Sequence, residues 1–343
     1  MNITVLLGGF SAERDVSLAS GLRIAEALRT KGHAVTCADP AHGPLTADEE
    51  RALLASGVGT RPPSRDALRA LGPREGISPE LVAWPAVRDA DVCFLALHGG
   101  QGEDGTLQAL LDLAGVRYTG SGHLASALAM DKQLSKILFR DAGVGTADWR
   151  MAPRPGTPAT AGFGDAVVRA LGLPVVVKPS KQGSSVALTV VREVAALDAA
   201  IAEAFVYDDE VLVEAFVAGR ELTVGLLGPD EVLPVYEIRP KNEIYDYECK
   251  YTAGMAEEGV AELAPEQAAE VQGQARRAYA ALKLAGCARI DFRMDATGRF
   301  FCLEANTLPG MTALSLVPQA ALASGLLFPD LCERIVGLAR NGD

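Results

Sequence analysis

The chain has 343 residues, of which 49% are apolar and 22% charged, and its net charge is −12. This composition is typical of a soluble globular protein, and the length suffices for two or three domains with buried cores. The negative charge disfavours nucleic acid or an anionic membrane as the main partner, although local lysines can still hold a small anion.

The six cysteines are scattered along the chain and form no Cys-x-x-Cys pair. Residues 1–7 are too few, and run into glycines too soon, to be the apolar core of a secretory signal. No run of about 18 apolar residues is present to span a membrane. These features predict a cytoplasmic protein with reduced thiols.

The N-terminal third has the pattern of a parallel sheet. A strand, a glycine-rich loop, a helix and a second strand are expected over residues 3–7, 8–17, 17–30 and 34–37. The dinucleotide fingerprint G-x-G-x-x-G is absent, and the acids Glu13 and Asp15 near the helix start would repel a pyrophosphate. A carboxylate there either caps the helix or binds a substrate ammonium group.

A third apolar strand, Val92–Leu97, runs into the glycine-rich loop His98–Gly105. Ligands of open α/β sheets gather where strands end in such loops. His98 is therefore either a buried structural histidine or a site residue. Residues 41–90 carry no recognisable chemistry.

The segment Lys178–Val186 combines lysines, a glycine and serines after an apolar strand, Leu173–Lys178. It lacks the Walker pattern and instead resembles a flap whose backbone N–H groups and hydroxyls close over phosphates. An ordinary turn would explain the glycine. It would not explain Lys178 at the end of an apolar strand, because a lysine there needs an anionic partner.

A β-hairpin is expected near the C-terminus, with strands Cys287–Met294 and Arg299–Ala305 joined by the turn-forming segment Asp295–Gly298. With the turn centred on residues 297–298, facing residues have numbers that sum to about 595. A bulge would shift this register by one residue.

That register pairs Asp291 with Glu304 and Arg289 with Asn306, and places all four side chains on one face. Two facing carboxylates repel each other unless a positive charge lies between them. Two acids and an amide oxygen suit Mg²⁺, although an exposed face with ordinary surface charges is the alternative. The other face is expected to enter the core through Ile290, Phe292, Leu303 and Ala305.

Seven stretches, in this order, resemble the D-alanine–D-alanine ligases of the ATP-grasp superfamily. They are Gly8–Ser17, Leu97–Thr106, Tyr118–Lys132, Lys178–Val186, Tyr245–Tyr251, Arg289–Asp291 and Leu303–Ser315. The resemblance covers nearly the whole chain apart from about 41–90.

The resemblance implies an α/β protein with the ATP-grasp fold and three α/β domains. An N-terminal, Rossmann-like parallel-sheet domain for substrate is expected at 1–121. A central domain with the phosphate flap is expected at 122–217, and a C-terminal domain with the metal and oxyanion site at 218–343. ATP is expected between the last two, and a homodimer is the family expectation.

The resemblance also implies how ATP and metal are held. Two Mg²⁺ ions, which Mn²⁺ can replace, are expected on Asp291, Glu304 and Asn306. The use of a monovalent cation stays open. The residues implied for ATP are Lys132, Lys178, Lys250 and Ser184 around the phosphates, Glu214 with the backbone of Ala215 and Val217 at adenine, and Glu221 at the ribose.

For the amino acids, the resemblance implies that Glu13, helped by His98, binds the ammonium group of a first D-alanine. The other implied roles are a link from Ser184 and Tyr251 to Glu13 that closes the site, an oxyanion contact from Arg289 and the Gly310 N–H, and a carboxylate contact from Ser315.

The implied reaction is ATP-dependent ligation of two D-alanines through an acylphosphate, for peptidoglycan precursors. Relatives that make D-alanyl-D-lactate typically carry a histidine where this chain has Tyr251, so an amine is favoured as second substrate. The alternatives are a ligase for another amino acid pair, a D-alanine–D-lactate or D-serine ligase, and a non-catalytic nucleotide-binding protein.

Overall fold

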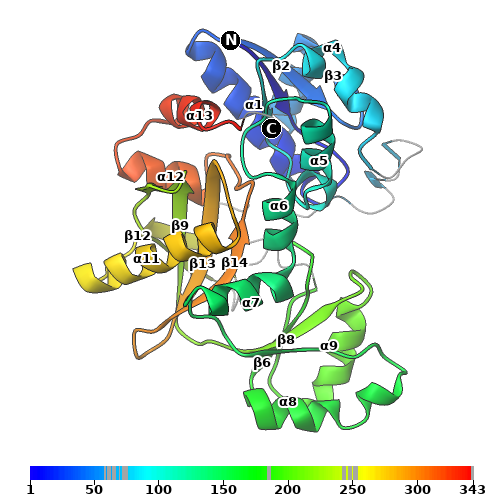
Figure 1. Ribbon diagram of the computed structural model, residues 1–343, viewed down its shortest axis with the longest axis vertical. Helices are drawn as coiled ribbons and strands as arrows, with labels where there is room; N and C mark the ends of the chain where they lie inside the picture. Colours follow the sequence, from blue (N-terminus) through cyan, green and yellow to red (C-terminus); the bar gives the residue numbers. More distant parts are fainter. Residues whose placement is uncertain are drawn as a thin grey trace.

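The computed structural model describes residues 1–57, 59, 63, 67–68, 70–71, 76–183, 187–241, 245, 249 and 254–340. Within these residues the chain forms three β-sheets, stacked along the long axis of the molecule (Figure 1). The N-terminal sheet lies at the top of Figure 1, the C-terminal sheet in the middle and the central sheet at the bottom.

The N-terminal sheet has the strand order β3-β2-β1-β4, and β1 runs parallel to both β2 and β4, as the sequence predicts. Helix α1 starts at Arg14, three residues before its predicted start. It packs closely against the end of β1: a Cβ added at Gly21 would lie only 2.5 Å from the Leu7 side chain. The elements are β1 (Asn2–Leu6), α1 (Arg14–Thr30), β2 (Ala34–Asp39), β3 (Gly43–Pro44), α2 (Ala47–Ser56), η1 (Pro79–Ala83), α4 (Pro85–Arg88), β4 (Val92–Leu95), η2 (Gly100–Gly102) and α5 (Thr106–Leu113).

The central sheet is antiparallel, with the order β5-β8-β6-β7. Two helices, α8 and α9, bury their apolar faces on it around Val167 and Leu197. Its elements are β5 (Trp149–Met151), η3 (Pro158–Thr160), α8 (Phe163–Leu171), β6 (Val175–Pro179), β7 (Thr189–Val191), η4 (Val194–Ala196), α9 (Leu197–Ala204) and β8 (Val211–Ala215).

The C-terminal sheet is also antiparallel, with the order β12-β11-β9-β13-β14 and β10 paired to β9. One core cluster runs from the N-terminal sheet through α1 to α12 and α13, so the two units share buried surface. The elements are β9 (Arg220–Leu227), β10 (Glu231–Val232), β11 (Tyr236–Pro240), β12 (Ala256–Val260), α11 (Pro265–Ala281), β13 (Cys287–Met294), β14 (Phe300–Asn306), α12 (Leu316–Ala323) and α13 (Phe328–Gly337).

Helices α6 (His123–Met130) and α7 (Lys132–Asp141) connect the N-terminal sheet to the central one. Their buried residues Ala125, Ala129 and Phe139 pack into the core of the C-terminal sheet. The division at residue 122 groups these helices with the central domain, whereas their apolar faces pack against α11 and β14 of the C-terminal unit.

The hairpin of β13 and β14 has the predicted pairs at its functional end, where Asp291 faces Glu304 and Arg289 faces Asn306. Nearer the turn the register shifts by one, and Phe292 faces Cys302. The strand β14 therefore contains one extra residue, Leu303, which is a β-bulge.

The bulge makes one prediction about the core wrong. Ile290, Phe292 and Ala305 are buried in the core as expected. Leu303 instead lines a pocket on the opposite face, and Cys302, fully buried, enters the core in its place. The physical reason is that an extra residue reverses the alternation of the side chains at that point.

None of the helices in the described part of the chain is long and apolar enough to cross a membrane. The six cysteines are all buried, and no disulfide joins any of them within the described residues.

Candidate active site

Two pockets lie between the sheets and share a wall. Residues from the N-terminal loops, the flap and the loop after β14 line the first pocket, and residues from the central sheet and β13 line the second. Five residues line both pockets: Lys132, Gln182, Tyr245, Arg289 and Glu304.

Every predicted site residue that the structure describes lines one of these pockets. In the first pocket lie Glu13, His98, Lys132, Arg289, Glu304, Asn306, Gly310 and Ser315. In the second lie Lys132, Lys178, Glu214, Ala215, Val217, Glu221, Arg289, Asp291 and Glu304. The predictions for Ser184, Lys250 and Tyr251 fall outside the described residues.

Glu13 occupies the N-cap position of α1, but its side chain makes no capping hydrogen bond. Its carboxylate points to the first pocket instead, where a Cβ built on Gly183 would lie 3.1 Å from Oε2 and one on Gly99 3.0 Å from it. The capping alternative is therefore not what the structure shows. A carboxylate at this place can bind a cation inside the pocket.

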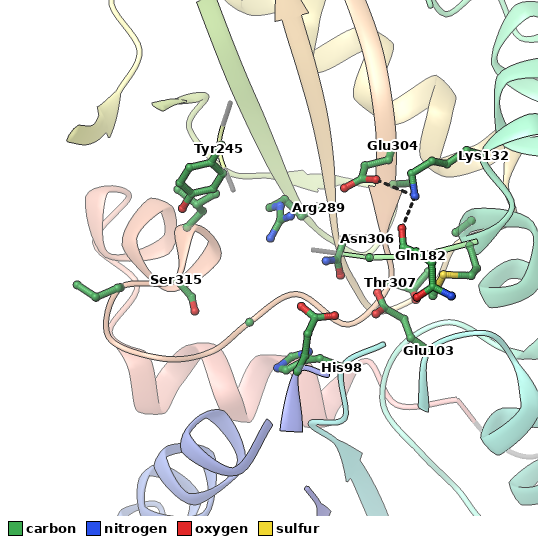
Figure 2. Close-up of a pocket in the computed structure, with 18 residues that line it drawn as sticks. His98, Glu103, Lys132, Gln182, Tyr245, Arg289, Glu304, Asn306, Thr307 and Ser315 are labelled. Carbon is green, nitrogen blue, oxygen red and sulfur yellow. Dashed lines mark hydrogen bonds and ion pairs between the residues drawn. The ribbon is translucent and has the colours of Figure 1, made fainter. Parts of the chain in front are cut away.

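His98 lies against the same pocket, as Figure 2 shows, and both of its ring nitrogens have protein partners. Nδ1 lies 2.8 Å from the Leu308 carbonyl, and Nε2 lies 3.4 Å from the Ser20 hydroxyl. Burial lowers the pKa of His98, outweighing the opposing effect of Glu13. A neutral ring then donates from Nδ1 and accepts from Ser20, so His98 ties the loop after β14 to α1.

Glu103 is a buried acid in the same pocket that the sequence reading did not single out. Burial, and then the charge of Glu13, raise its pKa to about 7, although the Gly99 N–H donates to its carboxylate at 2.9 Å. An acid in a glycine-rich loop directly after a strand was the available signal.

The loop after β14 carries two predicted contacts, Gly310 and Ser315. A Cβ at Gly310 would lie only 2.8 Å from Ser315 Oγ, so a larger residue would displace that hydroxyl. Ser315 Oγ accepts a hydrogen bond from the Thr312 N–H at 3.0 Å and lies 2.9 Å from the Thr312 hydroxyl. The loop therefore fixes where the Ser315 hydroxyl points.

Arg289 and Asp291 form a bidentate ion pair on β13. Nε lies 2.9 Å from one carboxylate oxygen and Nη2 2.9 Å from the other. Burial alone would lower the pKa of Arg289, but the Asp291 carboxylate outweighs it and raises the pKa. Thr223 also donates to Asp291, at 2.6 Å. The guanidinium is thus held rigidly at the wall between the two pockets.

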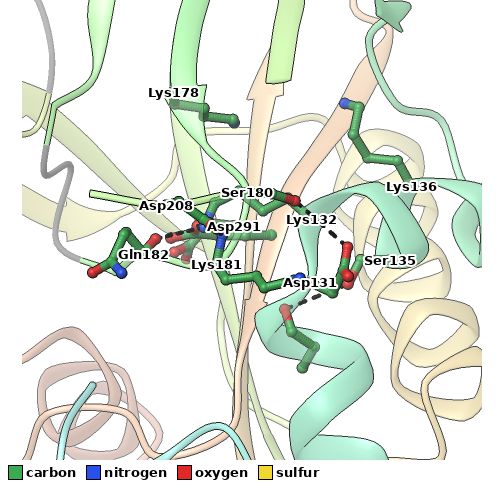
Figure 3. Close-up of polar contacts among 12 residues, drawn as sticks. Asp131, Lys132, Ser135, Lys136, Lys178, Ser180, Lys181, Gln182, Asp208 and Asp291 are labelled. Carbon is green, nitrogen blue, oxygen red and sulfur yellow. Dashed lines mark hydrogen bonds and ion pairs between the residues drawn. The ribbon is translucent and has the colours of Figure 1, made fainter. Parts of the chain in front are cut away.

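Lys132 joins the flap to the hairpin. Its ammonium lies 3.2 Å from Glu304 Oε2 and donates to the Gln182 carbonyl at 2.7 Å (Figure 2). Figure 3 shows the base of the flap lying over the start of α7, where the Lys132 N–H donates to the Ser180 carbonyl at 3.2 Å. The Lys181 N–H donates to Asp208 at 2.6 Å.

Glu214 lies between two lysines in the second pocket. The Lys178 ammonium is 2.5 Å from one of its oxygens and the Lys136 ammonium 2.8 Å from the other. Burial would raise the pKa of Glu214, but Lys136 and Lys178 outweigh it and lower that pKa to about 2. The anionic partner that the sequence predicts for Lys178 is therefore Glu214.

Lys136 was missed by the sequence reading, although it follows Lys132 by four residues on one helix, a spacing that places both on one face. It is fully buried, and its ammonium also donates to the Thr146 hydroxyl at 2.7 Å. The remaining wall of this pocket includes the apolar residues Val176, Leu188, Phe216 and Leu303.

The metal expected from the sequence would rest on two carboxylates and one amide. The described residues contain no cluster of three or more His, Cys, Asp or Glu that could hold a metal ion. Mg²⁺ commonly binds through one or two carboxylates together with substrate phosphates and water. The oxygen donors of Asp291, Glu304 and Asn306 at the pocket wall fit an ion bound in that way.

Comparison with known proteins gives matches along nearly the whole chain. The family model described as D-ala D-ala ligase N-terminus matches residues 2–121, and the one described as D-ala D-ala ligase C-terminus matches residues 138–337. The D-alanine–D-alanine ligase of Geobacter sulfurreducens is 43% identical over 336 residues, which cover 97% of this chain and 92% of that protein.

Solved structures are similar over the same extent. The D-alanine–D-alanine ligase from Bacillus anthracis complexed with ATP superposes with a TM-score of 0.76 at 30% identity, covering 98% of this chain and 96% of that chain. The VanG D-Ala:D-Ser ligase from Enterococcus faecalis has a TM-score of 0.78 at 30% identity, covering 98% of each chain.

The fold, with its two adjoining pockets, is that of an ATP-grasp ligase. Within that class, the matches to both family models and to relatives at about 40% identity are decisive. The chain belongs to the D-alanine–D-alanine ligase family.

Because the pKa of Glu214 is lowered, the loss of folding stability on replacing Glu214 should depend on pH. The folded-state pKa of about 2 lies below the ordinary value of 4.5, so the stabilisation is complete above about pH 4.5 and is lost as pH falls towards 2. Glu214→Gln should therefore lower the free energy of unfolding by about 3 kcal/mol at pH 7. The difference from wild type should shrink at pH 3 in urea titrations.

Asp148→Asn provides the control, because Asp148 forms an exposed ion pair with Arg140. It should change stability by less than about 1 kcal/mol at either pH. A Glu214→Gln effect of equal size at pH 7 and pH 3 would contradict the assignment.

Proposed function

We propose that this chain uses ATP to join two D-alanines into D-alanyl-D-alanine, a peptidoglycan precursor, through an acylphosphate. The observation that supports this most directly is the shared wall. Residues expected to hold amino acids and residues expected to hold ATP line two pockets that meet at Lys132, Arg289 and Glu304. A carboxylate in the first pocket and a phosphate in the second would meet there, and such positioning accounts for much of catalysis.

In the first step, the carboxylate of one D-alanine attacks the terminal phosphate of ATP, which forms the acylphosphate and releases ADP. Glu13 binds the ammonium group of that D-alanine and so orients its carboxylate towards the wall. Lys132 and Lys178 contact the phosphates, and the apolar wall around Leu303 receives the base beside Glu214. Glu221 binds the ribose; its Oε2 atom lies 3.4 Å from Nη2 of Arg293.

Asp291, Glu304 and Asn306 would hold Mg²⁺, which supplies charge neutralisation during phosphoryl transfer. Arg289 and Lys132 already lie against two of these residues, and so they balance the same negative charge.

In the second step, the amine of the second D-alanine attacks the carbonyl carbon of the acylphosphate; the peptide bond forms as the amine loses a proton and inorganic phosphate leaves. Arg289 and the Gly310 N–H stabilise the oxyanion that forms, and Ser315 holds the carboxylate of the second D-alanine. His98 keeps the loop that carries Gly310 and Ser315 in place through the Leu308 carbonyl.

A different second substrate is the main alternative. The similarity to a D-Ala:D-Ser ligase structure is the observation that favours D-serine in that role. The homodimer and the domain boundaries at residues 121 and 217 stay predictions. A cytoplasmic location stays a prediction, based on the scattered spacing of the six cysteines in the sequence.

The direct test is ADP release with ATP and Mg²⁺, comparing D-alanine alone, L-alanine, D-alanine with D-lactate, and D-alanine with D-serine. Release that needs only D-alanine, with a dipeptide as product, supports the proposal. Release only with another pair would replace the substrate while keeping the ligase class. No release with any pair would favour a protein that binds ATP without turnover.

Arg289→Ala should lower kcat by about 10²–10³, because one oxyanion donor typically contributes that much. Arg289→Lys should fail too, since an ammonium cannot reproduce the planar guanidinium that both oxygens of Asp291 hold. ATP affinity, measured by calorimetry, should stay within severalfold of wild type.

Arg220→Lys is the matched control, because Arg220 forms a similar bidentate pair with Glu237 outside both pockets. Its turnover should be close to wild type. Near-normal turnover of Arg289→Lys would contradict the proposed contact of Arg289 with the oxyanion.

The raised pKa of Glu103 predicts a pH dependence of D-alanine capture. Below about pH 7 this carboxyl is neutral, and above it the carboxylate adds negative charge near Glu13, which favours an ammonium group. The value of kcat/KM for D-alanine, which reports the free enzyme, should therefore rise as pH increases through about 7. Glu103→Gln should lack that rise, and an unchanged profile in this variant would assign the titration to another group.

A further inference from the structure

Helix α1 carries an arginine that grips the loop after β14 from outside both pockets. Nη1 of Arg23 donates to the Met311 carbonyl and to the Thr312 carbonyl, each at 2.9 Å. The guanidinium carbon lies 3.6 Å from the centre of the Phe328 ring on α13, which holds it as a cation–π contact. Arg23 itself lines neither pocket.

The grip reaches the first pocket through a short chain of contacts. The Met311 carbonyl that Arg23 binds and the Thr312 N–H belong to one peptide group, and that N–H donates to Ser315 Oγ at 3.0 Å. The neighbouring Met311 N–H donates to Ser20 Oγ at 3.1 Å, so α1 holds the loop at a second point one turn away. Two bonds to a charged donor are stronger than neutral ones.

The same helix also begins beside Glu13, the predicted contact for the first amino acid. An α-helix is a stiff element, so the distance between Glu13 and the Arg23 guanidinium is nearly fixed. The loop held by Arg23 carries Gly310 and Ser315, the predicted contacts for the second step. The geometry therefore relates the two amino acid positions through one helix.

We propose that Arg23 is a positioning residue for the second amino acid: by fixing the Met311 and Thr312 carbonyls it sets where Ser315 Oγ points. Arg23 acts through Ser315 and touches neither substrate. This inference rests on the proposed function, in which Ser315 holds the carboxylate of the second D-alanine.

The test compares Arg23→Met with wild type in the dipeptide-forming reaction. Methionine keeps an apolar stem against Phe328 but removes both hydrogen bonds to the loop. The KM for the second D-alanine should rise about tenfold, the size expected when hydrogen bonds from a charged donor are lost. In the variants below, the KM for D-alanine likewise means that of the second D-alanine. The KM for ATP should stay within about twofold.

A double-mutant cycle separates positioning from general stability. In a Ser315→Ala background, Arg23→Met should change the KM for D-alanine by less than about twofold, because the hydroxyl it positions is gone. A tenfold effect that persists in that background would overturn the proposal. If Ser315→Ala alone leaves the KM unchanged, the proposed role of Ser315 fails instead, so the two failures are distinguishable.

Arg29→Met is the matched control on the same helix. Arg29 donates to Glu50 at 2.7 and 2.9 Å and to the Val35 carbonyl at 2.9 Å, and it does not reach the loop. It should lower the melting temperature at least as much as Arg23→Met and leave the KM for D-alanine unchanged. An equal rise in KM for both variants would make the effect structural and overturn the proposal.

Should Arg23→Met fail to fold, Phe328→Leu carries the same test, because it removes the ring under the guanidinium and leaves the arginine in place. The KM for D-alanine should then rise by a smaller factor, and only when Ser315 is present. No rise with Ser315 present would overturn the proposal.

Discussion

Two like charges that face each other across one hairpin are the constraint around which this protein is built. Asp291 and Glu304 are directly opposed on β13 and β14, where their repulsion is destabilising unless cations balance it. Arg289 provides one cation from the same face of the same strand, and Lys132 provides the other from α7. Balancing the hairpin thus brings the start of α7 to the C-terminal sheet.

The same lysine carries the constraint further. Because Lys132 also donates to the Gln182 carbonyl, the base of the flap is held against the acids of the hairpin. On the other side, the loop after β14 is held by His98, Ser20 and Arg23 from the N-terminal unit. Three sheets that are separate in their backbone pairing therefore meet at one place, through side chains rather than through strands.

Much of the site could be predicted from local patterns. The predicted pair of Asp291 with Glu304 is present, but the register predicted next to the turn is wrong: Phe292 faces Cys302, and the bulge at Leu303 restores the predicted pairs beyond it. A lysine at the end of an apolar strand sufficed to require an anion. Which anion it is could not be predicted from the local sequence, because Glu214 lies 36 residues from Lys178 and contacts it only because β6 and β8 are neighbours. Glu103 was missed for a similar reason, because its pKa depends on burial and on Glu13, which the loop sequence does not reveal.

The bulge at Leu303 allows β14 to do what a regular strand cannot. In a regular strand, neighbours point to opposite faces, so two residues on one face are separated by a third. Leu303 and Glu304 are consecutive, and both line the second pocket. An apolar side chain and a carboxylate are thereby attached to Cα atoms about 3.8 Å apart. The apolar side chain suits a flat apolar ring, and the carboxylate suits a cation. A hairpin without the bulge would not place Leu303 beside Glu304 on the face that lines the second pocket.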